Sequence, residues 1–164
     1  MKSWQERNEE HLLKLYPPLE KRVRKYIRDV ESQGVPLLII RGLATYAEQD
    51  ALYAKGRTAS GPRVTKARGG YSSHNFGLAV DVAPDDVDKP GLQPDWDGSQ
   101  PEWKIIVDTA PWHGLNSGVT FGDKPHLYLK ELRDTPDDAV RELFENGGLP
   151  AVWNYINVKL GIED

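Results

Sequence analysis

Apolar positions in the first part of the chain recur at helical spacing and then give way to a short continuous apolar run. Through residue 33 the apolar residues return every three or four positions, and the pair Pro17-Pro18 interrupts them. This pattern predicts two successive amphipathic helices. The run at 36–41 is rich in branched residues, and Gly42 ends it. This run predicts a buried strand.

A further helix is expected shortly after this strand. Thr45 stands three residues before Glu48, which is the spacing of a capping box, and Gly56 lies where a C-terminal cap would fall. Residues 57–73 then mix Gly, Pro, Ser, Thr and basic residues without a period. They predict a long loop, and long loops in compact domains are often functional.

The remainder of the chain contains two strand patterns among helical ones. Residues 78–83 alternate as a strand does, with Asp81 on the same face as two alanines, and residues 126–130 form a second candidate strand. Between the two, Ser99 and Glu102 have capping-box spacing and predict a helix through about Ala110.

Two more helices are predicted between 135 and 160, separated near Gly147. We therefore expect an α+β fold, in which a small antiparallel sheet is covered by helices. We predict one domain over 1–164, with a core at about 36–130 on which the C-terminal helices pack.

The composition narrows the classes of protein to which the chain can belong. Its 164 residues suffice for one domain, and 38% hydrophobic with 28% charged residues is within the range of soluble globular proteins. No apolar run approaches the ~20 residues that a membrane span needs. A net charge of −4 supplies no basic field for nucleic acid. We predict a soluble monomer that binds neither nucleic acid nor membrane.

Cysteine is absent from the chain. Disulfides are therefore excluded, and a transition metal would have to be held by imidazole and carboxylate groups. The opening segment MKSWQERNEEHLLKLY is charged and lacks the apolar core of a secretion signal. This segment predicts a protein that is made in the cytoplasm.

Asp81 stands inside the apolar run GLAVDVA, where an unpaired carboxylate would be costly to desolvate. A cation or several hydrogen-bond donors must therefore meet it. His74 lies just upstream, and Gly77 between them allows the backbone to turn tightly. An imidazole from the loop and a carboxylate from the strand can thus converge.

The sequence DKPH at 123–126 supplies the second half of a metal site. Its proline restricts the backbone just before His126 enters the second strand. If the two strands are neighbours, His74, Asp81 and His126 supply three ligands of a tetrahedral Zn²⁺, and a fourth position remains open, as catalytic sites require. Asp123 is then placed to act as a general base.

Two motifs in these segments resemble those of a known family. SSHNFGLAVDVAP resembles the Ser-x-His-x-x-Gly-x-Ala-x-Asp motif, and DKPH the Asp-x-x-His motif, of peptidoglycan metallopeptidases. These include D-alanyl-D-alanine carboxypeptidases and phage L-alanyl-D-glutamate endopeptidase endolysins. TYAEQDALYAKGRT at 45–58 is similar to a helix of the endolysin-type subgroup, so the resemblance covers most of 36–130.

The resemblance implies a fold, a cofactor and a substrate. The fold is of the hedgehog/D-Ala-D-Ala peptidase type, in which the small sheet forms the floor of the metal site. The family pattern assigns Zn²⁺ to His74, Asp81 and His126, and the catalytic acid–base role to Asp123. It implies hydrolysis of the peptide stems of peptidoglycan, most specifically between L-alanine and D-glutamate. The alternatives are a D-alanyl-D-alanine carboxypeptidase and a non-catalytic, zinc-stabilised wall-binding module.

One departure concerns the family's arginine, which is thought to bind substrate and stabilise the oxyanion. The family usually has Gly-Tyr-Arg-Thr/Ser after the first strand, whereas this chain has Ala44 at the arginine position. Losing one such donor typically costs ~10²- to 10³-fold in rate. Three explanations are open: Arg41 or Arg57 replaces the missing group, zinc alone polarises the carbonyl, or this chain is an attenuated or altered form.

Serine, tyrosine and tryptophan residues are further candidates for roles at the site. Ser72, at the serine position of the motif, is expected to hydrogen-bond around the site, and Tyr71, in the loop before His74, to contact substrate. A serine nucleophile is disfavoured, because no Gly-x-Ser-x-Gly elbow is present. The tryptophans are assigned to the core rather than to a substrate groove: Trp96, Trp103, Trp112 and Trp153.

The route of such an enzyme to its substrate follows from the opening segment. A wall-active protein without a secretion signal needs a pore, lysis or a non-classical exporter to leave the cell. We therefore expect a phage or prophage lysin that acts on the wall after release.

Overall fold

The computed structural model describes residues 2–86, 88–91 and 93–162. Contacts within the chain group into two compact units. Unit 1 comprises Met1–Leu43 and Gly77–Leu132, and unit 2 comprises Ala44–Phe76 and Arg133–Asp164. A single domain over the whole chain stays a prediction. In the described residues no helix combines the length and apolar character needed to cross a membrane.

Unit 1 is built on a four-stranded antiparallel sheet with the strand order β1-β2-β4-β3. Its strands are β1 (Leu37–Arg41), β2 (Ala79–Pro84), β3 (Leu115–Gly118) and β4 (Asp123–Leu129). The prediction of a small antiparallel sheet is confirmed. Strand β3 was not predicted, because its sequence LNSG contains one apolar side chain and therefore shows no alternation.

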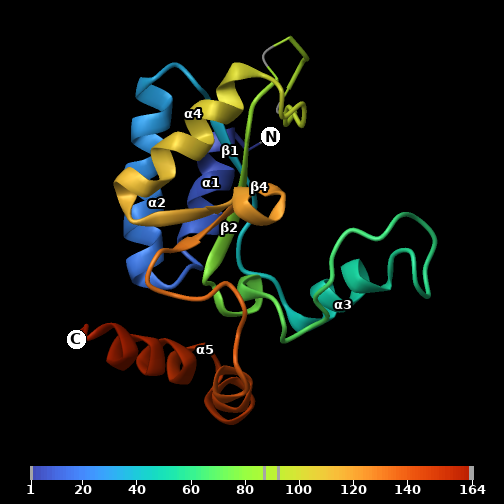
Figure 1. The fold of residues 1–164 in the computed structure, drawn as a ribbon, viewed down its shortest axis with the longest axis vertical. Coiled ribbons are helices and arrows are strands. Elements are labelled where there is room, and N and C mark those ends of the chain that lie inside the picture. The colour runs from blue at the N-terminus through green and yellow to red at the C-terminus, as the bar shows by residue number, and fades with distance from the viewer. Residues whose placement is uncertain (1, 87, 92, 163–164) are drawn as a thin grey trace. The chain divides into compact units, whose positions relative to one another are not determined.

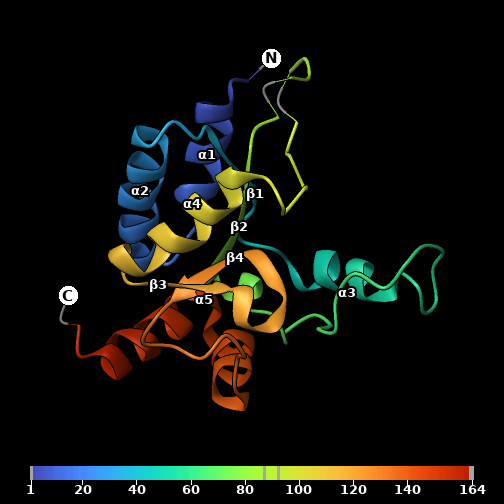
Figure 2. The ribbon, with the colours of Figure 1, turned by 45° about the horizontal axis from the view of Figure 1, so that its top comes forward.

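Three helices of unit 1 gather on one side of the sheet (Figures 1 and 2): α1 (Trp4–Leu12), α2 (Pro17–Ser32) and α4 (Pro101–Thr109). The first two match the predicted amphipathic pair. Helix α2 begins at Pro17, where the missing N–H costs nothing. Its apolar stripe is buried, and the Tyr26 hydroxyl donates to the carbonyl oxygen of Ile106 in α4 over 2.8 Å. These contacts fix α2 and α4 as one layer.

The predicted capping box at Ser99 is wrong. Helix α4 begins at Pro101 with Gln100 as its N-cap, and no side chain caps it. The Ser99 hydroxyl instead donates to Asp97 Oδ1 over 2.6 Å, within the preceding turn. Proline favours the first helical position because its φ is fixed. The helix therefore begins one residue later than a cap at Ser99 would place it.

Strand β1 lies at an edge of the sheet, and Asn8 of α1 covers its outward backbone groups. The Asn8 amide donates to the Leu37 carbonyl oxygen over 2.9 Å and accepts from the Ile39 N–H over 2.8 Å. Asn8 is 5% exposed. One buried amide thus replaces a missing neighbouring strand along part of this edge.

Unit 2 contains α3 (Tyr46–Ala54), the short 3₁₀ helix η1 (Ser73–Phe76) and α5 (Asp138–Leu160). The predicted capping box of Thr45 and Glu48 is confirmed. The two predicted C-terminal helices are also confirmed, because Gly148, with a φ of 68° and a ψ of −162°, separates α5 into two helical parts. A positive φ of this kind is strained for any residue with a Cβ.

Aromatic rings form the centre of unit 2. The ring of Tyr46 in α3 stacks on that of Phe144 in α5, with centroids 5.0 Å apart. Phe76 of η1 packs edge-on against Phe144 at 5.6 Å and is fully buried. Trp153 donates from its indole nitrogen to the Phe76 carbonyl oxygen over 2.7 Å. The turn that carries His74 is therefore anchored from both helices of this unit.

Candidate metal centre

A row of three side chains crosses the sheet of unit 1. Asp81 on β2 has Arg41 of β1 as its register partner on one side and His126 of β4 on the other. Residues directly opposite in antiparallel strands project from the same face of a sheet. The row therefore gathers a guanidinium, a carboxylate and an imidazole on one face.

An irregularity in β1 puts Arg41 into this row. Ile39 pairs with Val82, and the register then shifts by one residue, so that Arg41 rather than Ile40 stands opposite Asp81. An extra residue in one strand is a bulge, and bulges redirect the side chains that follow them. The strand was predictable from its apolar run, but this shift was not.

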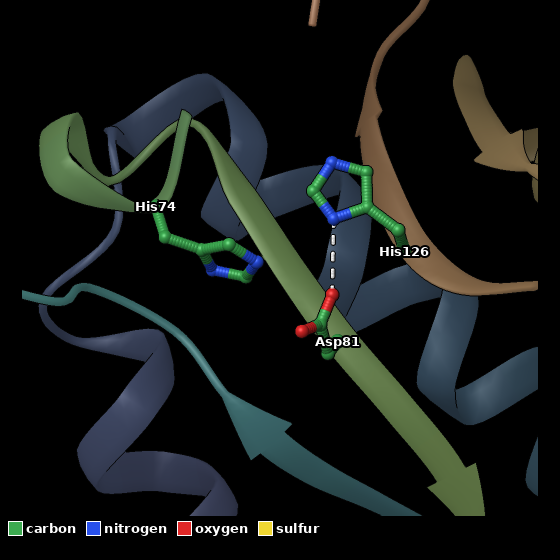
Figure 3. A group of neighbouring side chains, drawn as sticks. All are labelled: His74, Asp81 and His126. Atoms are coloured by element: carbon green, nitrogen blue, oxygen red, sulfur yellow. Dashed lines mark hydrogen bonds and ion pairs between the residues drawn. The ribbon is translucent and has the colours of Figure 1, made fainter. Parts of the chain in front are cut away.

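The central pair of the row is in direct contact. His126 Nδ1 and Asp81 Oδ1 lie 3.0 Å apart, and Figure 3 shows the two side chains turned toward each other from neighbouring strands. The His126 side chain is 7% exposed and that of Asp81 is 23% exposed. The carboxylate in the apolar strand thus meets an imidazole, as its position in GLAVDVA required.

His74 completes the cluster. One ligand atom from each of His74, Asp81 and His126 can be chosen so that all three lie within 4.8 Å of one another (Figure 3). His74 belongs to η1, seven residues before Asp81 along the chain, and is 2% exposed. The structure therefore brings together the three residues that the motifs had indicated.

The backbone of His74 is held within unit 2. Its N–H donates to Ser72 Oγ over 3.3 Å, and its carbonyl oxygen accepts from the Ala44 N–H over 2.9 Å. Ala44 is 3% exposed. The position where the family has arginine thus carries a small buried residue whose backbone fastens the turn of η1.

Asn75 was missed by sequence reasoning, although it adjoins His74. Its amide donates to the carbonyl oxygens of Ala44 and Thr45, over 3.1 and 3.2 Å, and its Oδ1 accepts from the Gly70 N–H over 3.0 Å. Asn75 is 2% exposed. An amide both donates and accepts, so one side chain can join two loops. The only signal in the sequence was a polar residue between His74 and the apolar Phe76.

Asp123 is the first residue of β4 and is exposed. It pairs with Gly118, whereas the neighbouring β3 residue Ser117 pairs with Leu127. The segment between Asp123 and Leu127 is therefore bulged, and simple alternation does not fix on which face Asp123 projects. Asp123 does not belong to the ligand cluster, and its role as a base stays a prediction.

Two aromatic rings adjoin the imidazole of His126. The Tyr128 ring lies 5.8 Å from it and the Phe121 ring 6.3 Å, measured between centroids. Phe121 is 54% exposed. Aromatic surface therefore adjoins the His126 end of the candidate ligand cluster.

The predicted substrate contacts Tyr71 and Arg57 both lie in unit 2. Tyr71 is 38% exposed, and the Arg68 and Arg141 guanidinium groups lie over its ring at 4.6 and 4.0 Å. A hydrogen bond from Arg68, followed by the charge of Arg141, holds the pKa of the Tyr71 phenol below its ordinary value. Arg57 donates to the Tyr53 carbonyl oxygen over 2.7 Å, and its guanidinium lies 3.8 Å from the centre of the Tyr53 ring.

The family described as VanY D-alanyl-D-alanine carboxypeptidase matches residues 13–116, which is more than half of the chain. The chain belongs to the VanY family. The matched segment includes His74 and Asp81 and ends before Asp123 and His126.

A curated relative is the peptidoglycan L-alanyl-D-glutamate endopeptidase CwlK of Bacillus subtilis (strain 168). It is 38% identical to this VanY-family chain over 105 residues, which cover 60% of the chain and 63% of CwlK. The chain thus spans less than two thirds of that relative's length.

Two solved structures share the fold. The LdcB LD-carboxypeptidase aligns with 85% of this chain and 67% of its own, at a TM-score of 0.53 and 18% identity. The vancomycin-resistance D,D-dipeptidase VanXYg aligns with 85% of this chain and 58% of its own, at a TM-score of 0.51 and 17% identity. The predicted α+β fold and the resemblance to peptidoglycan peptidases are confirmed.

Proposed function

We propose that the chain is a zinc-dependent peptidase that hydrolyses the stem peptide of peptidoglycan between L-alanine and D-glutamate. The observation that carries the proposal is the cluster of His74, Asp81 and His126 in a member of the VanY family. The similarity to CwlK favours the L-alanyl-D-glutamate bond. The family's description gives the second candidate, which is cleavage at a D-alanyl-D-alanine end.

The residues present fit zinc. Two imidazole nitrogens and one carboxylate form one of the ligand sets of catalytic zinc sites, which leave a further position open. The ligand atoms lie within 4.8 Å of one another, and both histidines are buried while Asp81 is partly exposed. Cysteine is absent from the chain, which fits a nitrogen and oxygen donor set. We therefore assign Zn²⁺ to these three residues. When bound, zinc would polarise the scissile carbonyl and lower the pKa of water.

The other roles go to residues around the cluster. Asp123 would accept the proton of the attacking water and return it to the leaving amine, because an exposed carboxylate near the last ligand can exchange protons with substrate. Arg41 would donate hydrogen bonds to the oxyanion. This role is supported by the register that sets Arg41 opposite Asp81. The Arg57 guanidinium instead donates to the Tyr53 carbonyl oxygen and lies over the Tyr53 ring.

The proposal is tested by digesting purified muropeptides with the zinc-loaded protein and identifying the new termini by mass spectrometry. We expect a new N-terminal D-glutamate. Release of terminal D-alanine would instead support the carboxypeptidase. If the wild type releases neither product, and both wild type and Asp123→Ala bind the wall, the non-catalytic binding module is the correct function. A phage-type route to the wall stays a prediction.

A further inference from the structure

A cavity of about 270 Å³ opens in unit 1 beside the start of β4. Two tryptophans, two residues of β4 and parts of the adjoining turns line it: Trp96, Trp103, Gly98, Val119, Lys124 and Pro125. The proposed metal and catalytic residues are not part of this lining. The cavity is therefore distinct from the proposed metal site.

Trp96 was predicted to belong to the core, and the structure contradicts this prediction. Trp96 is 53% exposed, and its ring stacks on that of Trp103 with centroids 6.2 Å apart and an angle of 27° between the planes. Trp103 is 2% exposed, and its indole nitrogen donates to the carbonyl oxygen of Asp95 over 3.0 Å. The buried ring thus fixes the backbone just before Trp96. A rigid indole that remains open to solvent is a preorganised binding surface.

Lys124 supplies the cationic group of the cavity lining. Its ammonium donates to the carbonyl oxygen of Gly98 over 3.1 Å, which ties β4 to the turn that follows Trp96. Pro125 adds an apolar, inflexible wall beside it. The cavity therefore combines a flat aromatic surface with one cationic group and backbone polar atoms.

This cavity lies close to the metal cluster. Lys124 and Pro125 immediately precede His126, and a strand advances ~3.3 Å per residue, so the cavity wall begins within ~7 Å of the ligand along the chain. Phe121, whose ring adjoins that of His126, lies two residues after Val119 of the cavity lining. The part of the cavity wall that belongs to β4 therefore directly precedes a proposed zinc ligand.

We infer that the cavity binds the N-acetylated amino sugar to which the stem peptide is attached. This inference rests on the proposed function. A pyranose ring presents a flat face of C–H groups that can stack on an indole, while its hydroxyl and acetamido groups turn toward water, Lys124 and backbone atoms. The face of an indole is apolar and its N–H is polar, which suits a ligand with one apolar side and one polar side.

The chemistry of the stem favours the same arrangement. The sugar is joined through its lactyl group to the L-alanine, and the bond to D-glutamate follows directly. One residue spans at most ~3.6 Å, so the sugar lies only about one residue and one linker from that bond. A D-alanyl-D-alanine bond lies at the far end of the stem. An occupied sugar cavity beside His126 therefore agrees with cleavage next to the glycan.

The test compares a disaccharide-linked stem peptide with the same peptide without sugar. We expect wild type to prefer the sugar-bearing substrate in kcat/KM, and Trp96→Ala to reduce that preference about tenfold, since loss of one well-packed aromatic contact has this size. Trp112→Ala, which removes an indole that is 85% exposed and lies outside the cavity, should keep it. An equal loss on both substrates, or no loss on either, would overturn the inference.

A binding measurement separates this inference from the proposed function. The zinc-loaded wild type is titrated with the free disaccharide of N-acetylglucosamine and N-acetylmuramic acid, and the indole N–H signals are followed by NMR. A shift of the Trp96 signal without a shift of the Trp112 signal supports the sugar site even if neither peptide is cleaved. If Trp96 does not respond while the peptides are cleaved, the sugar site is wrong and the proposed function stands.

Discussion

Arg41 is the register partner of Asp81 in the neighbouring strand, and this position suits the proposed donor to the oxyanion. Ala44, at the position of the family's arginine, is buried and engaged through its backbone N–H. A guanidinium on the same face of the sheet as the ligands can supply the charge that Ala44 lacks. Arginine suits this role because its planar fork donates two parallel hydrogen bonds.

We predict that Arg41→Met lowers kcat for stem-peptide hydrolysis by ~10²- to 10³-fold, the usual cost of losing one donor to an oxyanion. The zinc content, measured by atomic emission, should not change, because Arg41 is not in the ligand cluster. Methionine preserves much of the apolar stem. Arg28→Met on the exposed surface of α2 is the matched control and should retain full turnover. Wild-type turnover in Arg41→Met would leave Arg57 or zinc alone as the source of stabilisation.

Asn75 is a single residue whose hydrogen bonds attach the helix η1 to two loops. Its amide joins η1 to the loop at Ala44–Thr45 and to Gly70, and every one of these bonds lies within unit 2. His74 immediately precedes it, and the His74 carbonyl oxygen accepts from the same Ala44. The position of His74, the first residue of the proposed zinc site, therefore depends on a neighbour outside the ligand cluster.

We predict that Asn75→Ala lowers the free energy of unfolding by about 2–3 kcal/mol, because it leaves buried backbone groups without partners. It should also weaken zinc binding, since η1 loses its attachment. Urea denaturation and zinc titration measure the two effects. Asn154→Ala, at an exposed position of α5, controls for removal of an amide. A loss of stability with wild-type zinc affinity would show that η1 holds His74 without Asn75.

Some of the helices and strands could be predicted from the sequence, and others could not. The α2 stripe, the Thr45 cap and the alternation around Asp81 are local patterns, so α2, α3, β2 and the cluster of His74, Asp81 and His126 were predictable. Strand β3 exists only through its pairing with β4, and the shift that sets Arg41 opposite Asp81 is a property of two paired strands. Such features follow from tertiary pairing, which a single segment does not encode.

At the scale of the whole molecule, the three proposed zinc ligands come from segments that are separate in the sequence. His74 precedes β2, Asp81 lies within it, and His126 lies in β4. An unfolded chain cannot hold these donors together, so a metal that binds all three favours the folded state. Zinc bound to this cluster should therefore also contribute to stability.

We predict that zinc at about 1,000 times its Kd stabilises the metal-free protein by ~4 kcal/mol, which corresponds to a rise in Tm of about 10 °C. Thermal unfolding followed by circular dichroism, with chelator and then with zinc, measures the rise. His126→Ala should abolish it. His113→Ala removes an imidazole that contacts Asp29 at 2.7 Å, outside the cluster, and should lower Tm while keeping the zinc-induced rise. Equal zinc-induced rises in the two variants would show that zinc stabilises the fold at some other place and would remove His126 from the ligand set.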